Sequence, residues 1–320
     1  MSLSFHRYTL KSRAALNSRS DRVEHEGALI RVGEGDIGQA YGYGCIHPWP
    51  ELGDLDLDST LQCLKNGEST PLIRQALYCA RQDAVARGAG VSSFVGYTVP
   101  ESHATVALDE KSFIDARQAG FETVKVKVGR DLDTESQRIR LLAEKFPEFQ
   151  WRLDFNHTRS VSEVEGFLRS LGKGVCRKID FMEDAWLGGD EPAADIRGVP
   201  LAVDRELENP VGKFPVSIAK PARDSLDTIL ERAQAQGAKI VFTSYMDHPL
   251  GQSYAALQAA VANFAYPMMV DRCGLVTHGL FEPDAFSEAL GTVGPEFKPA
   301  AGTGLGFDDL LEKLSWTPLS

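Results

Sequence analysis

The chain has 320 residues, enough for one large barrel and a smaller domain. Hydrophobic residues make up 43% and charged residues 25%, as in an ordinary globular protein. The formal net charge of −11 argues against nucleic acid or an anionic membrane surface as a partner, although a local group of lysines could still bind a small anionic substrate.

Cysteine usage and hydropathy indicate the compartment. The five cysteines are scattered along the chain and form no CxxC pair, which favours reduced thiols in a cytosolic protein. No apolar run approaches the roughly 18 residues that a membrane span needs, and no signal-peptide pattern follows the first basic residues. We therefore expect a cytoplasmic protein.

The N-terminal part, residues 1–91, is predicted to form an α+β capping domain. Three strands are expected first, and the second and third pair through a turn at 33–36. Two helices follow, the longer one with Pro71 near its first turn and Gly88 at its end. The predicted elements are strands at 5–10, 28–32 and 38–44, and helices at 57–64 and 71–87.

From residue 92 to 299 strand-like and helix-like runs alternate, which predicts a (β/α)8-type barrel as the catalytic domain. The strands are expected at 93–98, 122–128, 150–155, 178–183, 200–204, 215–220, 238–243 and 274–279. The helices are expected at 111–119, 132–145, 160–170, 223–236, 250–263 and 282–290.

A doubly wound open sheet is the structural rival of the barrel. Its nucleotide-binding version loses support, because no GxGxxG or GxxxxGK[ST] motif stands at a strand–helix junction. The glycine-rich stretch 302–306 follows no predicted strand. We expect it to lead a helix at 308–314 back to the first domain, which residues 300–320 would then complete.

The second barrel strand carries an unusual pair of charges. Val124, Val126 and Val128 point to one face, while Lys125 and Lys127 point to the other. The two ammonium groups lie about 7 Å apart along the strand. They repel each other unless solvent, carboxylates or a substrate anion compensate them.

Charged residues also recur near the carboxyl ends of the strands that follow. They are Arg152, Asp154, Glu183, Asp204 and Lys220. From Lys127 to Lys220 the steps, omitting Arg152, are 27, 29, 21 and 16 residues, against roughly 30 per β/α unit in such a barrel. The carboxyl ends of barrel strands form the mouth, where active sites lie, so we expect these side chains to meet there.

Three carboxylates on adjacent strands would repel one another without a cation. Oxygen ligands on rigid strands suit Mg²⁺ or, alternatively, Mn²⁺, whereas Zn²⁺ is disfavoured because no histidine falls among them. The simpler alternatives are that a strand-end Asp caps the next helix and that Arg152 and Asp154 form an ion pair. Glu183 and Lys220 are poor caps, which favours the metal site.

Two lysines would flank that ion, Lys127 from one side and Lys220 from the opposite side of the ring. Lysine is a poor base at its free pKa of about 10.4. A nearby cation and a second ammonium both lower the pKa of a lysine. The predicted site could therefore remove a proton next to a carboxylate while the metal takes up the developing charge.

This set of residues resembles the enolase superfamily. The resemblance rests on the Lys-Val-Lys of the second strand, Asp154-Phe155-Asn156, Glu183, Asp204 and Lys220-Pro221. The paired lysines are similar to those of the muconate-lactonizing subgroup, and within it the chain resembles the o-succinylbenzoate synthase family of menaquinone biosynthesis.

The resemblance implies a role for each position. Lys127 would abstract the α-proton of a cyclohexadiene carboxylate and return it to the departing hydroxyl in a syn elimination of water. Lys220 would stabilise the anion and Lys125 would assist electrostatically. The family pattern further implies Mg²⁺ ligands at Asp154, Glu183 and Asp204, and substrate contacts at Arg152, Asn156, Thr243 and Ser244. Cap loops at 16–25 and 45–52 would close over the substrate.

The chain departs from the family pattern at several places, which are expected to affect specificity more than the proton chemistry. They are Arg205 after Asp204, the stretch 221–224 after Lys220, Tyr245-Met246 in strand seven, and the eighth-strand sequence 277–282. Other activities of the superfamily stay open: N-acylamino acid racemase, dipeptide epimerase and muconate cycloisomerase. A barrel that binds an anion without turnover is the non-enzymatic alternative, and the oligomeric state is open.

Overall fold

The computed structural model describes residues 2–14, 16, 20–33, 40–186, 194–204 and 212–319. Several sequence-based predictions lie outside this range. They are the turn at 34–36, the first two residues of the strand at 38–44, residues 17–19 of the first cap loop, and Arg205.

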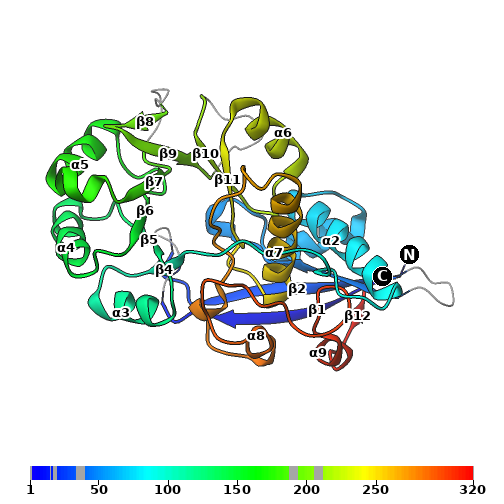
Figure 1. The fold of residues 1–320 in the computed structure, drawn as a ribbon. Coiled ribbons are helices and arrows are strands. Elements are labelled where there is room, and N and C mark those ends of the chain that lie inside the picture. The colour runs from blue at the N-terminus through cyan, green and yellow to red at the C-terminus, as the bar shows by residue number, and fades with distance from the viewer. Residues whose placement is uncertain are drawn as a thin grey trace.

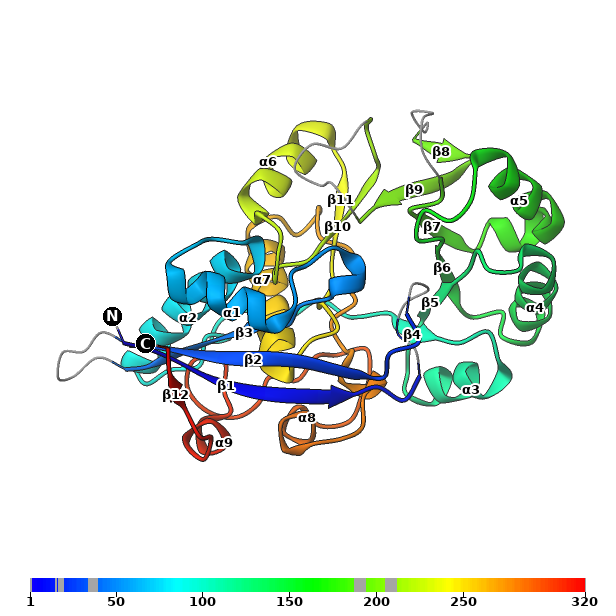
Figure 2. The same cartoon turned by 180° about the vertical axis from the view of Figure 1, so that it is seen from behind.

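The N-terminal part forms a four-stranded antiparallel sheet with two helices on it (Figures 1 and 2). The strand order is β12-β1-β2-β3. The predicted pairing of the second and third strands is confirmed, although β3 begins later than expected. The elements are β1 (Ser2–Lys11), β2 (Glu24–Gly33), β3 (Gly42–Ile46), a short 3-10 helix η1 (Pro50–Leu52), α1 (Leu57–Asn66), α2 (Pro71–Gly88) and β12 (Thr317–Pro318).

Glycines let helix α2 lie directly on β3. A Cβ at Gly42 would stand 1.8 Å from the carbonyl oxygen of Ala80, and one at Gly44 would stand 2.2 Å from that of Ala76. Any side chain at these positions would force the helix away from the sheet. The side chains of Asp56 and Thr70 cap the first turns of α1 and α2 by accepting backbone hydrogen bonds.

The second unit is a curled parallel sheet of barrel type, which confirms the predicted fold class. Its strand order is β11-β10-β9-β7-β6-β5-β4, and every neighbouring pair is parallel. The strands are β4 (Ala104–Val106), β5 (Thr123–Lys127), β6 (Gln150–Asp154), β7 (Ile179–Glu183), β9 (Val199–Val203), β10 (Val216–Ala219) and β11 (Lys239–Phe242). A short β8 (Asp195–Ile196) pairs antiparallel with β9.

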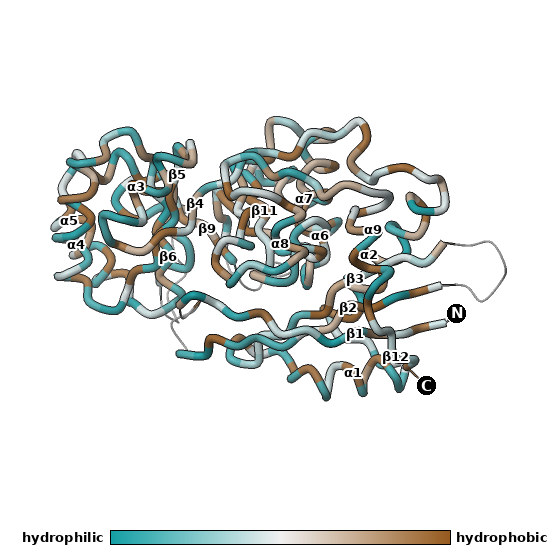
Figure 3. The backbone as a smooth tube through the Cα atoms, turned by 90° about the horizontal axis from the view of Figure 1, so that it is seen from below, coloured by the Kyte–Doolittle hydropathy of each residue, from teal (hydrophilic) through white to brown (hydrophobic). Residues whose placement is uncertain are grey.

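Helices follow the strands and cover the outside of the sheet. They are α3 (Glu110–Gln118), α4 (Leu132–Lys145), α5 (Val161–Cys176), α6 (Leu226–Gln236), α7 (Pro249–Ala265) and α8 (Ala285–Leu290). Hydrophobic and hydrophilic segments alternate along α4 and α5 (Figure 3), as expected for helices with one face on a sheet. Helix α7 is different, because twelve of its 17 residues are buried, and it contacts both β3 and β11. Among the described residues no helix combines the length and the apolar character needed to cross a bilayer.

Two predicted barrel strands are wrong. Residues 93–96 form turns, with Gly96 at a positive φ of 83°, residues 97–98 have no regular structure, and the first barrel strand is β4. Residues 278–280 form a 3-10 helix, η2 (His278–Leu280), where an eighth strand was expected. Residues 270–274, which precede the predicted eighth strand, close the barrel in its place. They make isolated parallel bridges to Ile240 and Thr243 on one side and to Ser102 on the other.

The interior of the barrel has an apolar floor beneath the charged residues. Its floor is a separate cluster formed by Phe181, Ala202, Val216, Ile218 and Val241. In β7 and β10 the charged residue follows a floor residue by two positions, so it points to the same interior face one layer higher. Glu183 and Lys220 thus lie above apolar residues, whereas Arg152 of β6 lies beside Phe181 in the lower layer.

The C-terminal segment returns to the N-terminal sheet. Helix α9 (Asp308–Glu312) and β12 follow the glycine-rich stretch, and β12 pairs with β1. The buried carboxylate of Asp83 in α2 accepts hydrogen bonds from Leu305 N at 2.7 Å, Tyr43 N at 2.9 Å and Arg87 Nε at 2.6 Å. We therefore propose a division into a cap of residues 1–91, completed by 300–320, and a barrel of residues 92–299.

Replacing Asp83 by Ala is expected to destabilise the fold by about 3 kcal/mol, because two buried amides lose their acceptor and the buried Arg87 guanidinium is left with Asp308 as its ion partner. Urea unfolding followed by circular dichroism measures the change. The matched control is Glu165→Ala, which removes only an exposed pair with Arg169 and is expected to cost about 0.5 kcal/mol or less. Equal losses in the two variants would contradict this role of Asp83.

Candidate active site

Three carboxylates lie at the carboxyl ends of three neighbouring strands. Asp154 ends β6 and Glu183 ends β7, and the two are register partners. Asp204 directly follows β9, in which Ala202 pairs with Glu183. All three side chains are largely buried, between 3% and 13% exposed. The strand order therefore brings together groups that are up to 50 residues apart in the sequence.

Lysines compensate these carboxylates in the structure. Lys125 Nζ lies 3.0 Å from Asp154 Oδ2 and 2.6 Å from Glu183 Oε2. Lys220 donates a hydrogen bond to Asp204 Oδ1. Each predicted metal ligand is thus ion-paired, and the two lysines come from strands on either side of the carboxylate group.

Burial and neighbouring charges shift the pKa values of this group in different directions. Burial, together with the charges of Asp154 and Asp204, raises the pKa of Glu183 to about 7 even though Lys125 opposes the shift. Burial alone would lower the pKa of Lys125, but Asp154 and Glu183 outweigh it and the pKa is raised. Lys220 and Arg223 lower the pKa of Asp204 despite its burial, so the three carboxylates do not respond alike.

The donor set fits a divalent cation in chemical type and in placement on the strands. The side-chain directions fit less well, because Asp154 and Glu183 converge on Lys125 whereas Asp204 points to Lys220. Within the described part of the chain, no three His, Cys, Asp or Glu side chains surround one position. A metal would therefore have to replace ammonium groups that now hold the ligands apart.

Lys127, the predicted base, is held differently from Lys125. Its Nζ donates a hydrogen bond to the carbonyl oxygen of Leu16, in the first predicted cap loop. Burial lowers the pKa of Lys127, and the neighbouring Lys125 and Lys220 lower it further, although Asp154 and Glu183 oppose the shift. This lysine is the one that its surroundings shift toward the neutral, proton-accepting form.

Backbone strain accompanies the ligand positions. Asn156 has φ 50° and Asp184 has φ 49°, both in the left-handed region that non-glycine residues seldom adopt. Asn156 donates to Asp154 Oδ1 from its backbone N at 3.1 Å and its side-chain Nδ2 at 2.8 Å. Asn156 therefore orients a predicted ligand, and its contact with substrate stays a prediction.

The structure corrects the prediction for Arg152. Its side chain is 1% exposed and lies one layer below Asp154. Nε donates to Asp180 at 2.8 Å, and Nη1 contacts His103 Nδ1 at 3.0 Å and the carbonyl oxygen of Arg272 at 2.6 Å. With these partners Arg152 ties the lower barrel together and has no access to a substrate at the mouth. No ion pair between Arg152 and Asp154 is found among the described contacts.

Thr243 and Ser244 follow β11, as expected for the mouth. Thr243 Oγ1 is buried and has no hydrogen-bond partner among the described residues, so it has the capacity to bind a ligand oxygen. Ser244 Oγ lies 2.6 Å from Thr277 Oγ1 and accepts from Met246 N at 3.2 Å. Their substrate contacts remain predictions.

Two residues near Asp204 were not among the predicted site residues. Arg223 Nη2 donates to the carbonyl oxygen of Asp204 at 2.8 Å, and Arg223 Nε donates to Asp224 Oδ1 at 3.1 Å. Asp224 Oδ2 in turn accepts from Lys220 N at 2.7 Å. The signal in the sequence was the charged stretch after Lys220, where the family pattern has small residues.

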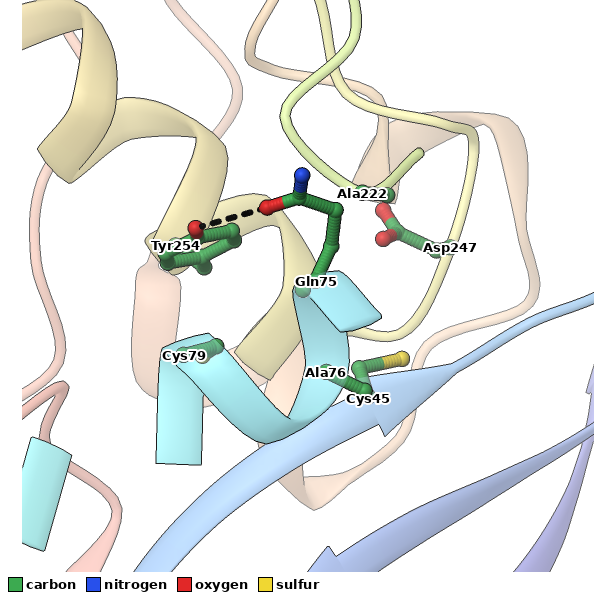
Figure 4. A pocket seen from close by; sticks show the side chains of 8 residues that line it. Cys45, Gln75, Ala76, Cys79, Ala222, Asp247 and Tyr254 are labelled. Carbon is green, nitrogen blue, oxygen red and sulfur yellow. Dashed lines mark hydrogen bonds between the residues drawn. The ribbon is translucent and has the colours of Figure 1, made fainter. Parts of the chain in front are cut away.

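A cavity between the cap and α7 is not part of this group (Figure 4). Cys45, Gln75, Asp247 and Tyr254 are among its lining residues, and none of the predicted ligands or lysines lines it. Its volume of about 10 Å³ is roughly the space that one water molecule needs. It is too small for a substrate.

Comparison with known proteins decides the family. Residues 3–86 match the family model described as "O-succinylbenzoate synthase, N-terminal domain". The curated o-succinylbenzoate synthase of Bdellovibrio bacteriovorus is 35% identical over 328 residues, which cover 99% of this chain and 98% of that protein. The chain belongs to the o-succinylbenzoate synthase family.

Solved structures support the same fold within the enolase superfamily. A dipeptide epimerase from Enterococcus faecalis V583, complexed with Mg and the dipeptide L-Leu-L-Tyr, has a TM-score of 0.80 at 16% identity and covers 95% of this chain and 98% of that one. An N-succinyl Arg/Lys racemase from Bacillus cereus has a TM-score of 0.76 at 18% identity and covers 98% and 97%. These solved structures share the fold of the chain, and its membership of the o-succinylbenzoate synthase family makes it an enzyme.

Proposed function

We propose that the chain is an o-succinylbenzoate synthase. It would catalyse the Mg²⁺-dependent syn dehydration of 2-succinyl-6-hydroxy-2,4-cyclohexadiene-1-carboxylate to o-succinylbenzoate, a step of menaquinone biosynthesis in the cytoplasm. The observation that carries the proposal is the pairing of a buried lysine of lowered pKa, Lys127, with three carboxylates at one rim. The full-length similarity to the Bdellovibrio protein supports the choice of reaction.

Each residue of the group has a proposed role. Asp154, Glu183 and Asp204 would hold Mg²⁺, with Mn²⁺ as the alternative. The ion supplies positive charge next to the substrate carboxylate, where negative charge develops after deprotonation. Loading the site requires Lys125 and Lys220 to release their carboxylates, so both ammonium groups become available to the anionic substrate.

Lys127 would move the proton. Its neutral amine takes the proton from the carbon that bears the carboxylate, and the resulting ammonium gives the same proton to the departing hydroxyl on that face. One C–H bond and one C–O bond break, one water molecule leaves, and the ring becomes aromatic. Lys220 would stabilise the anion from the other side, Lys125 would assist electrostatically, and Thr243 and Ser244 would bind the succinyl carboxylate.

A racemase or epimerase of N-acylated amino acids is the second candidate. The two lysines from opposite sides of the carboxylate group would serve a two-base reaction equally well, and solved structures with those titles share the fold. Muconate cycloisomerase is a third member of the same group of reactions. A barrel that binds a small anionic carboxylate without turnover is the remaining alternative.

An ultraviolet assay with the cyclohexadiene substrate and Mg²⁺ tests the proposal. We expect the aromatic product to form at a rate proportional to enzyme concentration. A parallel incubation of N-succinyl amino acids in D₂O, followed by NMR, tests for exchange of the α-proton. Exchange without dehydration would favour the racemase, and calorimetric Mg²⁺-dependent binding with neither product would favour the non-enzymatic barrel.

A further inference from the structure

Tyr245, one of the departures from the family pattern, joins the cap to the barrel. Its carbonyl oxygen accepts from Trp49 Nε1 at 2.8 Å, and its hydroxyl donates to Asp54 Oδ2 at 2.9 Å. The same Asp54 oxygen accepts from Trp49 N at 2.8 Å. Residues 49–54, called the cap segment below, are therefore fixed at two points to the loop that follows β11.

Arg223, at another of the departures, connects Tyr245 with Asp204. Its guanidinium carbon lies 5.5 Å from the centroid of the Tyr245 ring, within the range of a cation–π contact. Arg223 Nη2 lies 2.8 Å from the Asp204 carbonyl oxygen and 3.5 Å from Asp204 Oδ1. A continuous set of contacts thus runs from Asp54 in the cap through Tyr245 and Arg223 to a predicted metal ligand.

Both main-chain polar groups of Asp204 are held by side chains. Its N–H donates to Asp184 Oδ1 at 3.1 Å, and its carbonyl oxygen accepts from Arg223. Asp204 follows the last residue of β9, so strand pairing does not fix it directly. Arg223 and Asp184 thus fix the main chain that carries this carboxylate, while the carboxylate itself binds Lys220.

We propose that Arg223 is a positioning residue for Asp204, and that Tyr245 and Asp54 couple this ligand to the placement of the cap segment. The inference rests on the proposed function for the assignment of Asp204 as a ligand. Closing the cap segment over the barrel and aligning the third ligand would then be one event. Neither the closing of the cap segment nor the alignment of Asp204 requires direct contact between Arg223 and the substrate.

Arg223 has two opposing effects on a bound cation. Its positive charge repels the ion, whereas its hydrogen bond fixes the ligand. The closer contact is to the main-chain carbonyl, and Asp224 Oδ1 balances the guanidinium charge at 3.1 Å. Orientation therefore outweighs repulsion, and losing such an outer contact typically weakens metal binding by about 10- to 100-fold.

Titration with Mn²⁺ alone, followed by electron paramagnetic resonance without substrate, tests the inference on the full chain. We expect Arg223→Gln to weaken Mn²⁺ binding by about 10-fold or more. Arg223→Lys should weaken it nearly as much, because a single ammonium cannot contact Asp204 and Asp224 in the same geometry. Binding of Mn²⁺ to Arg223→Lys at wild-type affinity would overturn the positioning role, since charge alone would then suffice.

Two milder variants test the coupling. Tyr245→Phe and Asp54→Ala each remove the contact between the Tyr245 hydroxyl and the cap segment, and each should weaken Mn²⁺ binding by a few-fold. A double variant that combines Tyr245→Phe with Arg223→Gln should bind Mn²⁺ no more weakly than Arg223→Gln alone, because the contacts act in series. Fully additive losses, or unchanged affinity in Tyr245→Phe, would overturn the coupling.

Matched controls lie outside this set of contacts. Tyr254→Phe removes another buried tyrosine hydroxyl, and Arg169→Gln removes an arginine from an exposed helix pair. Both should bind Mn²⁺ as the wild type does. A wild-type chain that binds Mn²⁺ but dehydrates no substrate would overturn the proposed reaction alone, whereas a wild-type chain that binds no Mn²⁺ would overturn this inference as well.

Discussion

Replacing Lys127 by Ala is expected to reduce dehydration by at least about 10³-fold, to the limit of detection, while the fold is preserved. A positioned proton-transfer group typically contributes about 10²- to 10⁴-fold, and here one side chain serves as both base and acid. Neither neighbouring lysine can replace it, because Lys125 lies one layer deeper on β5 and Lys220 follows β10 on the other side of the carboxylate group. Initial rates in the ultraviolet assay measure the loss.

The control for this experiment is Lys111→Ala in α3, whose side chain is 84% exposed and far outside the site. Circular dichroism and urea unfolding should report the same fold for both variants and the wild type. A wild-type rate in Lys127→Ala would remove the assignment of the base. If Lys127→Ala loses both activity and structure, Lys127→Arg separates the two effects, because it keeps the long side chain but cannot become neutral.

Removal of divalent metal is expected to abolish turnover, and Glu183→Gln is expected to require on the order of 100-fold more Mg²⁺ for half-maximal rate. Glu183 lies in the middle of the three carboxylates and is 3% exposed, so its replacement removes one charge and one ligand oxygen from a buried site. The loss should be at least as large as that caused by changing an outer-shell partner. Rates measured against Mg²⁺ concentration give the shift.

Glu165→Gln is the matched control, since it removes the same charge from an exposed position on α5. Its Mg²⁺ dependence should equal that of the wild type. Chelation with EDTA followed by added Mg²⁺ should restore full activity. Full activity in the presence of EDTA would show that the reaction proceeds without the metal and would end the ligand assignments.

The sequence predicted the barrel and its charged rim well where local pattern and tertiary role coincide. In β5 the buried Val124 and Val126 face the helices while Lys125 and Lys127 face the interior. Period-two alternation in a short strand is fixed by the backbone itself, so it can be recognised without knowledge of the neighbours. A different argument, their recurrence about once per β/α unit near the ends of the strands, predicted that Asp154, Glu183, Asp204 and Lys220 lie at one end of the sheet.

The errors arise where pairing with distant residues determines the structure. β4 has only three residues, too few for any periodicity, and residues 270–274 join the sheet through isolated bridges. Arg152 shares its interior face with Asp154, but only the coordinates show that Asp180 and the carbonyl oxygen of Arg272 already bind it. Likewise the pairing of Arg223 with Asp204 depends on a contact between two loops.

The pairing of β12 with β1 has a consequence for biosynthesis. Ser4 pairs with Pro318, a separation of 314 positions, so the cap sheet lacks its outer strand until residue 318 has left the ribosome. The barrel strands, whose partners are mostly neighbours in sequence, can assemble during translation. The cap sheet is therefore completed after the barrel strands have been synthesised.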